Sequence, residues 1–93
     1  MRVIGKQQLD KFCEKHVDVR SQISSWLAEV ENAEWQNPNE LKTRYPSASL
    51  VEKRVVFNLK GNKYRLLVRI DYKRQLIRIE KIGTHEEYDR WEF

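Results

Sequence analysis

The sequence predicts an α+β fold: a single small domain over residues 1–93, with a four-stranded, mainly antiparallel sheet and a helical hairpin packed on one face. Two patterns predict this class. Apolar residues recur at helical spacing through the first third of the chain, and from Leu50 onward branched and aromatic residues alternate at strand spacing. Because 34% of the residues are charged, the apolar residues suffice for only one modest core.

The N-terminal part is predicted to contain a short strand followed by two helices. Residues 2–4 form a β-like run that ends at Gly5. Asp18 is the predicted N-cap of the second helix, and the short break before it makes the pair an αα-hairpin. The buried stripe of the first helix comprises Leu9, Phe12, Cys13, His16 and Val17, and that of the second comprises Val19, Ile23, Trp26, Leu27 and Val30.

A short helix is predicted in the middle of the chain. Asn37 is its predicted N-cap, Pro38 occupies the first helical position, and the helix is expected to end before Pro46. Residues 47–49 are expected to form a loop that leads into the sheet.

Three strands are predicted in the C-terminal half. The run VVFNLKGNKYRLLVRIDY is rich in branched and aromatic residues, and Gly61-Asn62 in its middle predicts a two-residue hairpin turn. The run QLIRIEKI predicts the next strand. The N-terminal strand is expected to join this sheet, since a single short strand gains stability only by pairing. The order of elements is thus β-α-α-β-β-β.

Composition narrows the function classes. There is no apolar run of about 18 residues and no continuous apolar stretch at the N-terminus, so we expect neither a membrane span nor a secretory signal. The single cysteine, Cys13, excludes an internal disulfide and a multi-cysteine metal site, and its apolar neighbours favour a buried, inert thiol. The formal net charge of +4 favours an anionic partner such as nucleic acid or an acidic protein.

Strand alternation predicts a side of the sheet that faces the helices and an outer face. With Gly61-Asn62 as the turn, Asn58 lies opposite Arg65, and side chains two residues apart share a face. The side expected to face the helices comprises Phe57, Leu59, Tyr64, Leu66, Val68, Ile70, Ile77 and Ile79. The outer face comprises Asn58, Lys60, Lys63, Arg65, Leu67, Arg69, Leu76, Arg78, Glu80 and Ile82.

The outer face is predicted to bind an anion. With residues 73–74 as the second turn, Arg69 lies opposite Arg78 and Arg65 lies opposite Ile82. Like charges directly opposite each other destabilise a sheet, so Arg65, Arg69 and Arg78 are expected to hold an anion such as an RNA phosphate. The alternative is a face that is basic only to stay solvated.

The stretch IGTHEEYDRWEF, residues 82–93, is predicted to supply acid/base chemistry. Thr84 is expected to cap a helical turn that begins at His85, with Glu87 completing a capping box. His85 and Tyr88 are then i and i+3 and point to one side, beside the outer face. An imidazole, a phenol and arginines suit RNA cleavage by the RNA's own 2′-hydroxyl, which needs proton transfer and charge stabilisation at the phosphate. The alternative is a surface histidine, and the spacing does not fit a metal-binding motif.

The segments FNLKGNKYRLLVRIDY and IGTHEEYD together resemble the HigB family of toxins from type II toxin-antitoxin modules, part of the RelE-like superfamily. The resemblance covers most of the chain, because its length and order of elements also fit. It implies a RelE-like fold and a metal-independent endoribonuclease that needs no cofactor and cleaves mRNA on the translating ribosome. It also implies a cognate HigA-like antitoxin with a helix-turn-helix domain. A cytoplasmic location is expected because the sequence predicts neither a membrane span nor a secretory signal.

The resemblance also implies roles for individual residues. His85 is the expected general acid or base, Arg65 the main phosphate ligand, with help from Lys60, and Tyr88 a positioning residue. Some RelE-like relatives lack a histidine here and use Lys and Arg with a C-terminal Tyr, so the acid/base assignment stays open. The other motif residues are Asn58, Gly61, Asn62 and Asp89, and the face geometry adds Lys63, Arg69 and Arg78 as RNA contacts. The competing functions are a non-catalytic RNA- or ribosome-binding module and a protein-interaction domain.

Overall fold

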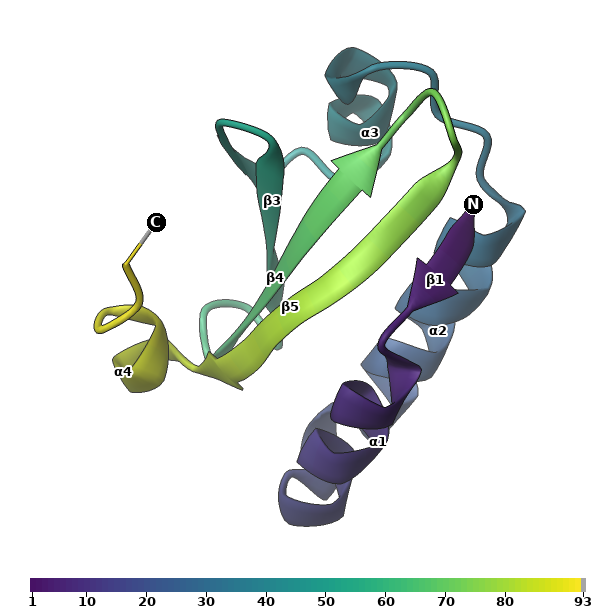
Figure 1. The fold of residues 1–93 in the computed structure, drawn as a ribbon. Helices are drawn as coiled ribbons and strands as arrows, with labels where there is room; N and C mark the ends of the chain where they lie inside the picture. Colours follow the sequence, from purple (N-terminus) through teal and green to yellow (C-terminus); the bar gives the residue numbers. More distant parts are fainter. Residues whose placement is uncertain (93) are drawn as a thin grey trace.

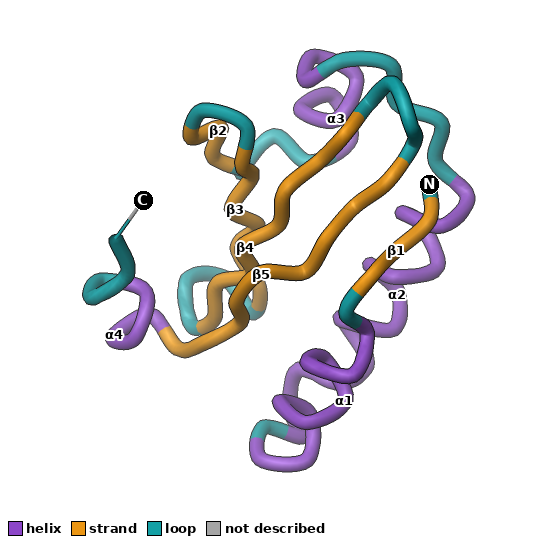
Figure 2. Tube along the Cα trace, in the orientation of Figure 1, coloured by secondary structure: helices purple, strands orange, loops and turns teal. Residues whose placement is uncertain are grey.

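Five strands within residues 1–92 form one mixed sheet in the order β1-β5-β4-β3-β2, as Figure 1 and, for β2, Figure 2 show. The structure is a computed structural model that describes residues 1–92, and Phe93 lies outside this part of the chain. The strands are β1 (Arg2–Ile4), β2 (Ser49–Val51), β3 (Arg54–Leu59), β4 (Tyr64–Asp71) and β5 (Leu76–Thr84). The helices are α1 (Lys6–Lys15), the 3₁₀ turn η1 (Val17–Val19), α2 (Arg20–Asn32), α3 (Pro38–Arg44) and α4 (His85–Tyr88).

The α+β class is confirmed, but the predicted four-stranded sheet is wrong by one strand. The segment around Ser49, expected to be loop, forms the edge strand β2 and pairs antiparallel with β3. The pairing is possible because Glu52 adopts a left-handed backbone conformation (φ 57°), which reverses the chain within two residues. The N-terminal strand β1 joins the sheet as predicted, and its pairing with β5 is parallel.

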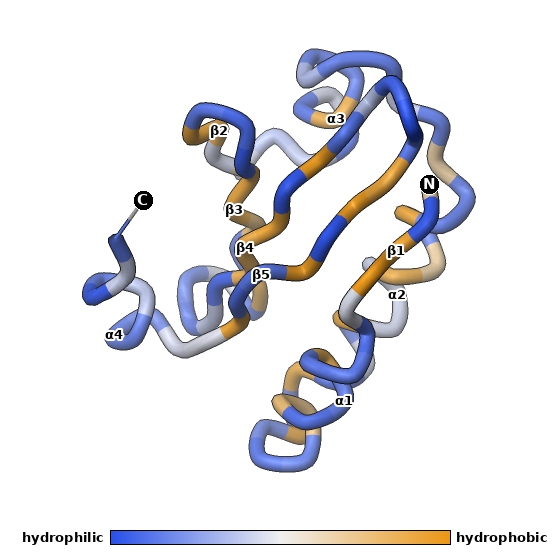
Figure 3. Tube along the Cα trace, viewed as in Figure 1, coloured by the Kyte–Doolittle hydropathy of each residue, from blue (hydrophilic) through white to orange (hydrophobic). Residues whose placement is uncertain are grey.

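Helices α1, α2 and α3 cover one face of the sheet and enclose the core with it (Figure 2). The side chains predicted to face the helices are buried there, and Figure 3 shows the hydrophobic positions along the strands and α2. Val17, predicted to be buried, is 67% exposed, because α1 ends at Lys15 and the chain turns into η1. None of the helices in residues 1–92 is long and apolar enough to span a lipid bilayer.

Of the N-cap residues predicted for α2 and α3, Asn37 is confirmed and Asp18 is wrong. Asn37 caps α3 as predicted, with its side chain accepting a hydrogen bond from the backbone N–H of Glu40. Asp18 does not cap α2, because it lies within η1 and its carboxylate accepts hydrogen bonds from Lys63 and Tyr64. This carboxylate therefore joins the helical layer to the end of the β3–β4 hairpin.

The register of the hairpin β3–β4 is the predicted one, with Asn58 opposite Arg65. The Lys63 N–H donates to the Lys60 carbonyl oxygen at 3.2 Å, so Gly61-Asn62 lie at the centre of the turn as predicted. The strands end at Leu59 and Tyr64, however, so the connection comprises residues 60–63, with positive φ angles at Lys60 (51°) and Gly61 (65°). This connection, the β3–β4 loop, reaches the end of the sheet where β5 leads into α4 (Figure 1).

A β-bulge changes the register between β4 and β5. Arg69 lies opposite Arg78 as predicted, but beyond the shift between Leu67 and Val68 the partner of Arg65 is Gly83 rather than Ile82. Ile82 is consequently not on the outer face and packs partly buried against the core. The bulge brings Gly83, which has no side chain, opposite Arg65.

Candidate functional site

The outer face of the sheet is less uniformly basic than predicted. Val56 and Leu67 lie opposite each other on β3 and β4 and are nearly fully buried, although neither belongs to the core under the helices. They form an apolar floor at the middle of the outer face. Arg65 is next to this floor and is itself only 8% exposed, so its charge is held at a largely desolvated position.

The Arg65 guanidinium is fixed by backbone carbonyls and by an aromatic ring. Its Nη1 donates to the carbonyl oxygens of Asn62 (2.9 Å) and Tyr64 (3.3 Å). Its central carbon lies 5.2 Å from the centre of the Tyr88 ring, a cation–π distance. Both hydrogen bonds of this guanidinium within residues 1–92 use Nη1, so Nε and Nη2 keep their capacity to donate.

The helical turn α4 is built as the sequence predicts. Thr84 accepts a hydrogen bond from the Glu87 N–H, and the Glu87 carboxylate accepts one from the Thr84 N–H, which completes a capping box. The His85 N–H donates to the carbonyl oxygen of Lys63 at 2.9 Å, so the β3–β4 loop holds the start of α4. Hydrogen bonds therefore connect the end of β5, the β3–β4 loop and α4 to one another.

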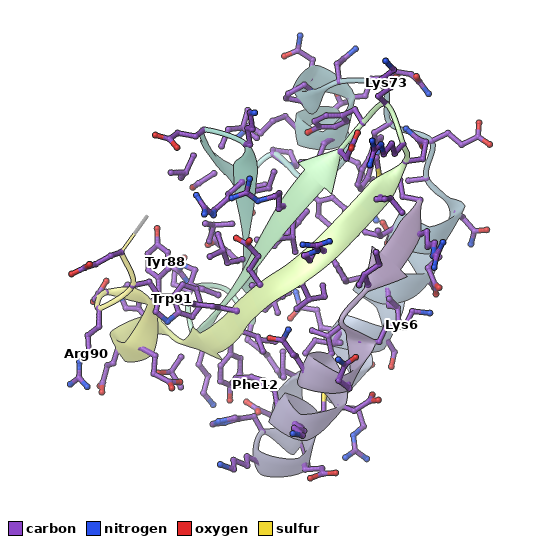
Figure 4. All side chains as sticks on the ribbon, in the orientation of Figure 1. Lys6, Phe12, Lys73, Tyr88, Arg90 and Trp91 are labelled. Atoms are coloured by element: carbon purple, nitrogen blue, oxygen red, sulfur yellow. The ribbon has the colours of Figure 1, made fainter. Side chains whose placement is uncertain are left out.

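Gly83 lets the C-terminal segment approach the sheet. A Cβ atom at this position would lie 3.0 Å from the Trp91 ring and 3.2 Å from the Glu87 side chain. Trp91 also packs edge-on against Tyr88 at 5.6 Å, and Figure 4 shows the two side chains together. The glycine thus allows α4 and the residues after it to pack on β5 directly opposite Arg65.

His85 lies on the same side of α4 as Tyr88. The two ring centres are 6.4 Å apart with nearly parallel planes, as the i and i+3 spacing predicts. Nε2 of His85 lies 4.0 Å from a carboxylate oxygen of Asp89, and the imidazole is about half exposed. Tyr88 therefore contacts both the buried Arg65 guanidinium and the exposed His85 imidazole.

The residues of β3 and of the β3–β4 loop that are predicted to bind RNA have separate environments. The carbonyl oxygen of Asn62 holds Arg65, as described above. Lys60 is exposed, and its backbone N–H donates to the Gln22 side chain at 2.7 Å. The Lys63 ammonium donates to Asp18 at 2.8 Å on the helical side, so its predicted place on the outer face is wrong. The Asn58 amide donates to the carbonyl oxygen of Ser47 at 3.2 Å, near β2.

Three arginines form a row across the outer face, and one of them, Arg54, is not among the residues predicted for this face. Arg54, Arg69 and Arg78 occupy paired positions on β3, β4 and β5. The Glu80 carboxylate accepts from Nε of Arg54 at 2.7 Å and of Arg69 at 3.5 Å. The strand β3 begins at Arg54, before the first position for which strand alternation predicts a face. Continuing that alternation backward from Val56 would have found it.

The two arginine partners of Glu80 favour the charged form of its carboxyl group. Burial alone would raise the pKa of this carboxyl, but the hydrogen bonds and charges of Arg54 and Arg69 outweigh burial and leave the pKa below its usual range. Arg69 is four residues from Arg65 on β4, about 13 Å at the usual rise of a strand. The arginine row is therefore a second cationic region, apart from Arg65 and partly neutralised.

No three His, Cys, Asp or Glu side chains within residues 1–92 come together as a metal-ligand set. Cys13 is buried as predicted, and burial is the main cause that raises the pKa of its thiol. His16, at the end of α1, stacks on Phe12 at 4.3 Å between ring centres, as a core-edge side chain does.

The fold and the site define a class: a small α+β protein that holds a guanidinium beside a phenol and an imidazole at the exit of its last strand. Comparison with known proteins gives the family. Residues 19–91 match the HigB toxin family, described as the RelE-like toxic component of a toxin-antitoxin system. The chain belongs to this family, and the resemblance seen in its two motifs is confirmed. An antitoxin partner follows from membership of such a system.

Curated relatives support the same assignment across nearly the whole chain. The chain is 26% identical over 92 residues to the mRNA interferase toxin HigB of Escherichia coli K12, an alignment that covers 96% of this chain and 88% of the relative. The mRNA interferases HigB of Escherichia coli O157:H7 and Shigella flexneri match with the same identity and coverage.

Proposed function

We propose that this toxin is an endoribonuclease that cleaves mRNA by attack of the RNA's own 2′-hydroxyl, at the surface formed by Arg65, Tyr88 and His85. The observation that carries the proposal is the contact of the Tyr88 ring with both the guanidinium and the imidazole. The names of the relatives, which describe mRNA interferases, support RNA as the substrate.

In this proposal Arg65 is the phosphate ligand. Cleavage by the 2′-hydroxyl gathers negative charge on the scissile phosphate, and a preorganised donor stabilises that charge without having to reorganise. Arg65 is preorganised because two carbonyl oxygens and the Tyr88 ring fix its guanidinium. Lys60, exposed in the adjacent loop, supplies a second cation, and Asn58 and Asn62 are the proposed polar contacts to RNA.

His85 is the proposed proton-transfer group. Histidine is the side chain whose charge changes in the physiological pH range, so an imidazole suits both removal of the 2′-OH proton and protonation of the 5′-oxygen. Asp89, whose carboxylate lies 4.0 Å from Nε2, is the proposed residue that orients the imidazole. Tyr88 positions the phosphate through Arg65 or stacks on a base of the substrate.

We further propose that cleavage takes place in the cytoplasm on the translating ribosome, without a metal ion or an organic cofactor. The cognate antitoxin is proposed to be a HigA-like protein with a helix-turn-helix domain. The arginine row and the net charge of +4 support long-range attraction to ribosomal and messenger RNA.

A non-catalytic RNA- or ribosome-binding module is the second candidate function. The row of Arg54, Arg69 and Arg78 favours it, because these side chains lie away from His85 and would bind a backbone without cleaving it. The two functions predict different effects of replacing His85 or Tyr88. Only the enzymatic function requires these side chains.

Induction in bacteria tests the proposal. Wild-type protein is expected to arrest growth and to produce site-specific mRNA ends, whereas Arg65→Ala and at least one of His85→Ala and Tyr88→Ala abolish both effects. Arg74→Ala is the matched control, because Arg74 is an exposed cation in the β4–β5 turn, at the other end of the sheet. A harmless wild type, or folded site variants as toxic as wild type, would contradict the enzymatic function.

A further inference from the structure

The β3–β4 loop, residues 60–63, contacts both halves of the proposed site through its backbone. The carbonyl oxygen of Asn62 accepts from the Arg65 guanidinium, and that of Lys63 accepts from the His85 N–H, each at 2.9 Å. A shift of this loop would therefore move the phosphate ligand and the proton-transfer group relative to each other. The loop position is a determinant of the site geometry.

The helical layer holds this loop from the opposite side. Gln22 on α2 accepts a hydrogen bond from the backbone N–H of Lys60 at 2.7 Å. Asp18 in η1 accepts from the Lys63 ammonium and from the Tyr64 hydroxyl, both at 2.8 Å. The partners are 38 to 46 residues apart in the sequence, so these are tertiary contacts that local turn preferences cannot supply.

The backbone of the loop needs such support. Lys60 has φ 51° and Gly61 has φ 65°, and the left-handed region costs a residue with a side chain roughly 1 kcal/mol. The Gln22 contact lies on the strained residue itself, and the Asp18 contact lies at the other end of the loop. The two side chains thus clamp the loop at both ends.

We propose that Asp18 and Gln22 are positioning residues for the RNA-cleaving site, acting through the β3–β4 loop on Arg65 and His85. Lys63 then serves as the anchor of the loop, because its ammonium is engaged by Asp18, and not as a phosphate contact. The inference rests on the proposed function for its kinetic consequence. That Asp18 and Gln22 hold the loop in place is a structural claim, and it can be tested without measuring activity.

The first test is kinetic. Asp18→Ala and Gln22→Ala are expected to lower kcat for mRNA cleavage by about 10- to 100-fold, the effect of a misplaced catalytic group, with KM changed less than about threefold. Asp10→Ala and Ser21→Ala, exposed positions on α1 and α2, are the matched controls and are expected to behave like wild type. Unchanged kcat in both clamp variants would overturn the inference, whereas an inactive wild type would overturn the proposed function.

Hydrogen exchange provides a readout independent of activity. The His85 amide is expected to exchange faster in folded Asp18→Ala protein, with the amides of α3 unaffected, because the loop carbonyl that accepts from it is released. Exchange that accelerates equally across the whole chain would indicate a general loss of stability and contradict a positioning role. Exchange that is unchanged at His85 would contradict the clamp itself.

A double substitution separates the two roles of Lys63. If Lys63 is an anchor, Asp18→Ala and Lys63→Met are strongly non-additive, and the double variant loses no more activity than the worse single one. The salt dependence of RNA affinity is then the same for Lys63→Met and wild type. A phosphate contact predicts additive losses and a slope of log affinity against log salt reduced by about 0.7 to 0.9.

Discussion

The Arg65 guanidinium lies over the Tyr88 ring, 5.2 Å from its centre, although the two residues come from different elements, β4 and α4. The contact exists because Gly83, opposite Arg65, leaves room for α4 to fold back against the sheet. His85 lies on the same turn as Tyr88, so the imidazole is next to the ring that contacts the arginine. The helical turn α4 thus packs at the outer face.

Replacing Arg65 separates charge from geometry. Arg65→Lys keeps a cation but loses the planar fork that two carbonyls and a ring orient, so kcat is expected to fall by about 10²- to 10³-fold, nearly as far as in Arg65→Ala. Single-turnover cleavage of ribosome-bound mRNA measures this. Full activity in Arg65→Lys would show that only the charge matters, and that a phosphate is not held by two donors of the guanidinium at once.

Tyr88 is predicted to act mainly through its ring. Tyr88→Phe preserves the surface that contacts Arg65 and is expected to keep activity within about threefold of wild type, while Tyr88→Leu loses the cation–π contact and most of the activity. The same cleavage assay compares the two variants. Equal loss in both would assign the essential role to the phenol hydroxyl instead.

Gly83→Ala is predicted to displace the C-terminal segment. The new methyl group would overlap the Trp91 ring and crowd Glu87, a kind of overpacking that costs about 1–3 kcal/mol, and cleavage should fall as α4 moves from Arg65. Urea unfolding and the cleavage assay measure the two effects. Adding Trp91→Ala to Gly83→Ala is expected to restore part of the lost stability. If the double variant loses the full sum of both single costs, the packing explanation fails.

Acid is predicted to weaken the fold through Asp18 and Glu80. Hydrogen bonds from Lys63 and Tyr64 hold the pKa of Asp18 below its usual range, and the arginine pairs lower that of Glu80. Because a lowered pKa favours the folded state only while the carboxylate is charged, its contribution is complete above the unfolded values of about 4 and is lost as pH falls through the folded ones.

Urea unfolding between pH 2 and pH 7 measures this dependence. Asp18→Asn is expected to flatten the decline of unfolding free energy below about pH 4, because the substituted group no longer titrates. An Asp18→Asn curve parallel to wild type over this range would show that Asp18 does not stabilise the fold in this way.

The arginine row is predicted to contribute to RNA affinity and not to cleavage. Arg54→Ala and Arg78→Ala should weaken binding of single-stranded RNA and lower its salt dependence, with kcat near the wild-type value. Glu80→Gln should strengthen binding, because it releases Arg54 and Arg69 from their ion pairs. Fluorescence anisotropy at several salt concentrations measures these changes. Weaker binding in Glu80→Gln would contradict the role of the row.

Local sequence patterns predicted the features that depend on neighbouring residues. The capping box of Thr84 and Glu87, the Asn37 cap and the β3–β4 register all follow from spacing within a few residues, and each is confirmed. The proximity of the C-terminal turn to Arg65 was also predicted from strand pairing, although with Ile82 as the partner instead of Gly83.

The features that local patterns missed depend on distant contacts. The bulge beside Leu67 adds a residue to β5 that period-two counting cannot detect, and it moves Ile82 to the core. Asp18 has the sequence features of a helix cap, but its hydrogen-bond partners lie at residues 63 and 64. Lys63 does not lie on the predicted outer face for the same reason. Its ammonium donates to the Asp18 carboxylate, and a residue at the end of a loop need not keep the side-chain direction that strand alternation predicts.

The most direct test of the central claim, that this surface cleaves RNA through its 2′-hydroxyl, is cleavage of an mRNA whose scissile nucleotide carries a 2′-deoxy substitution. We predict that wild-type protein cuts the ribosome-bound unmodified mRNA to leave a 5′-hydroxyl end, that the deoxy mRNA is not cut at that position, and that Arg65→Ala cuts neither. Cleavage of the deoxy mRNA at the same position, or unchanged cleavage of the normal mRNA by folded Arg65→Ala protein, would contradict the account.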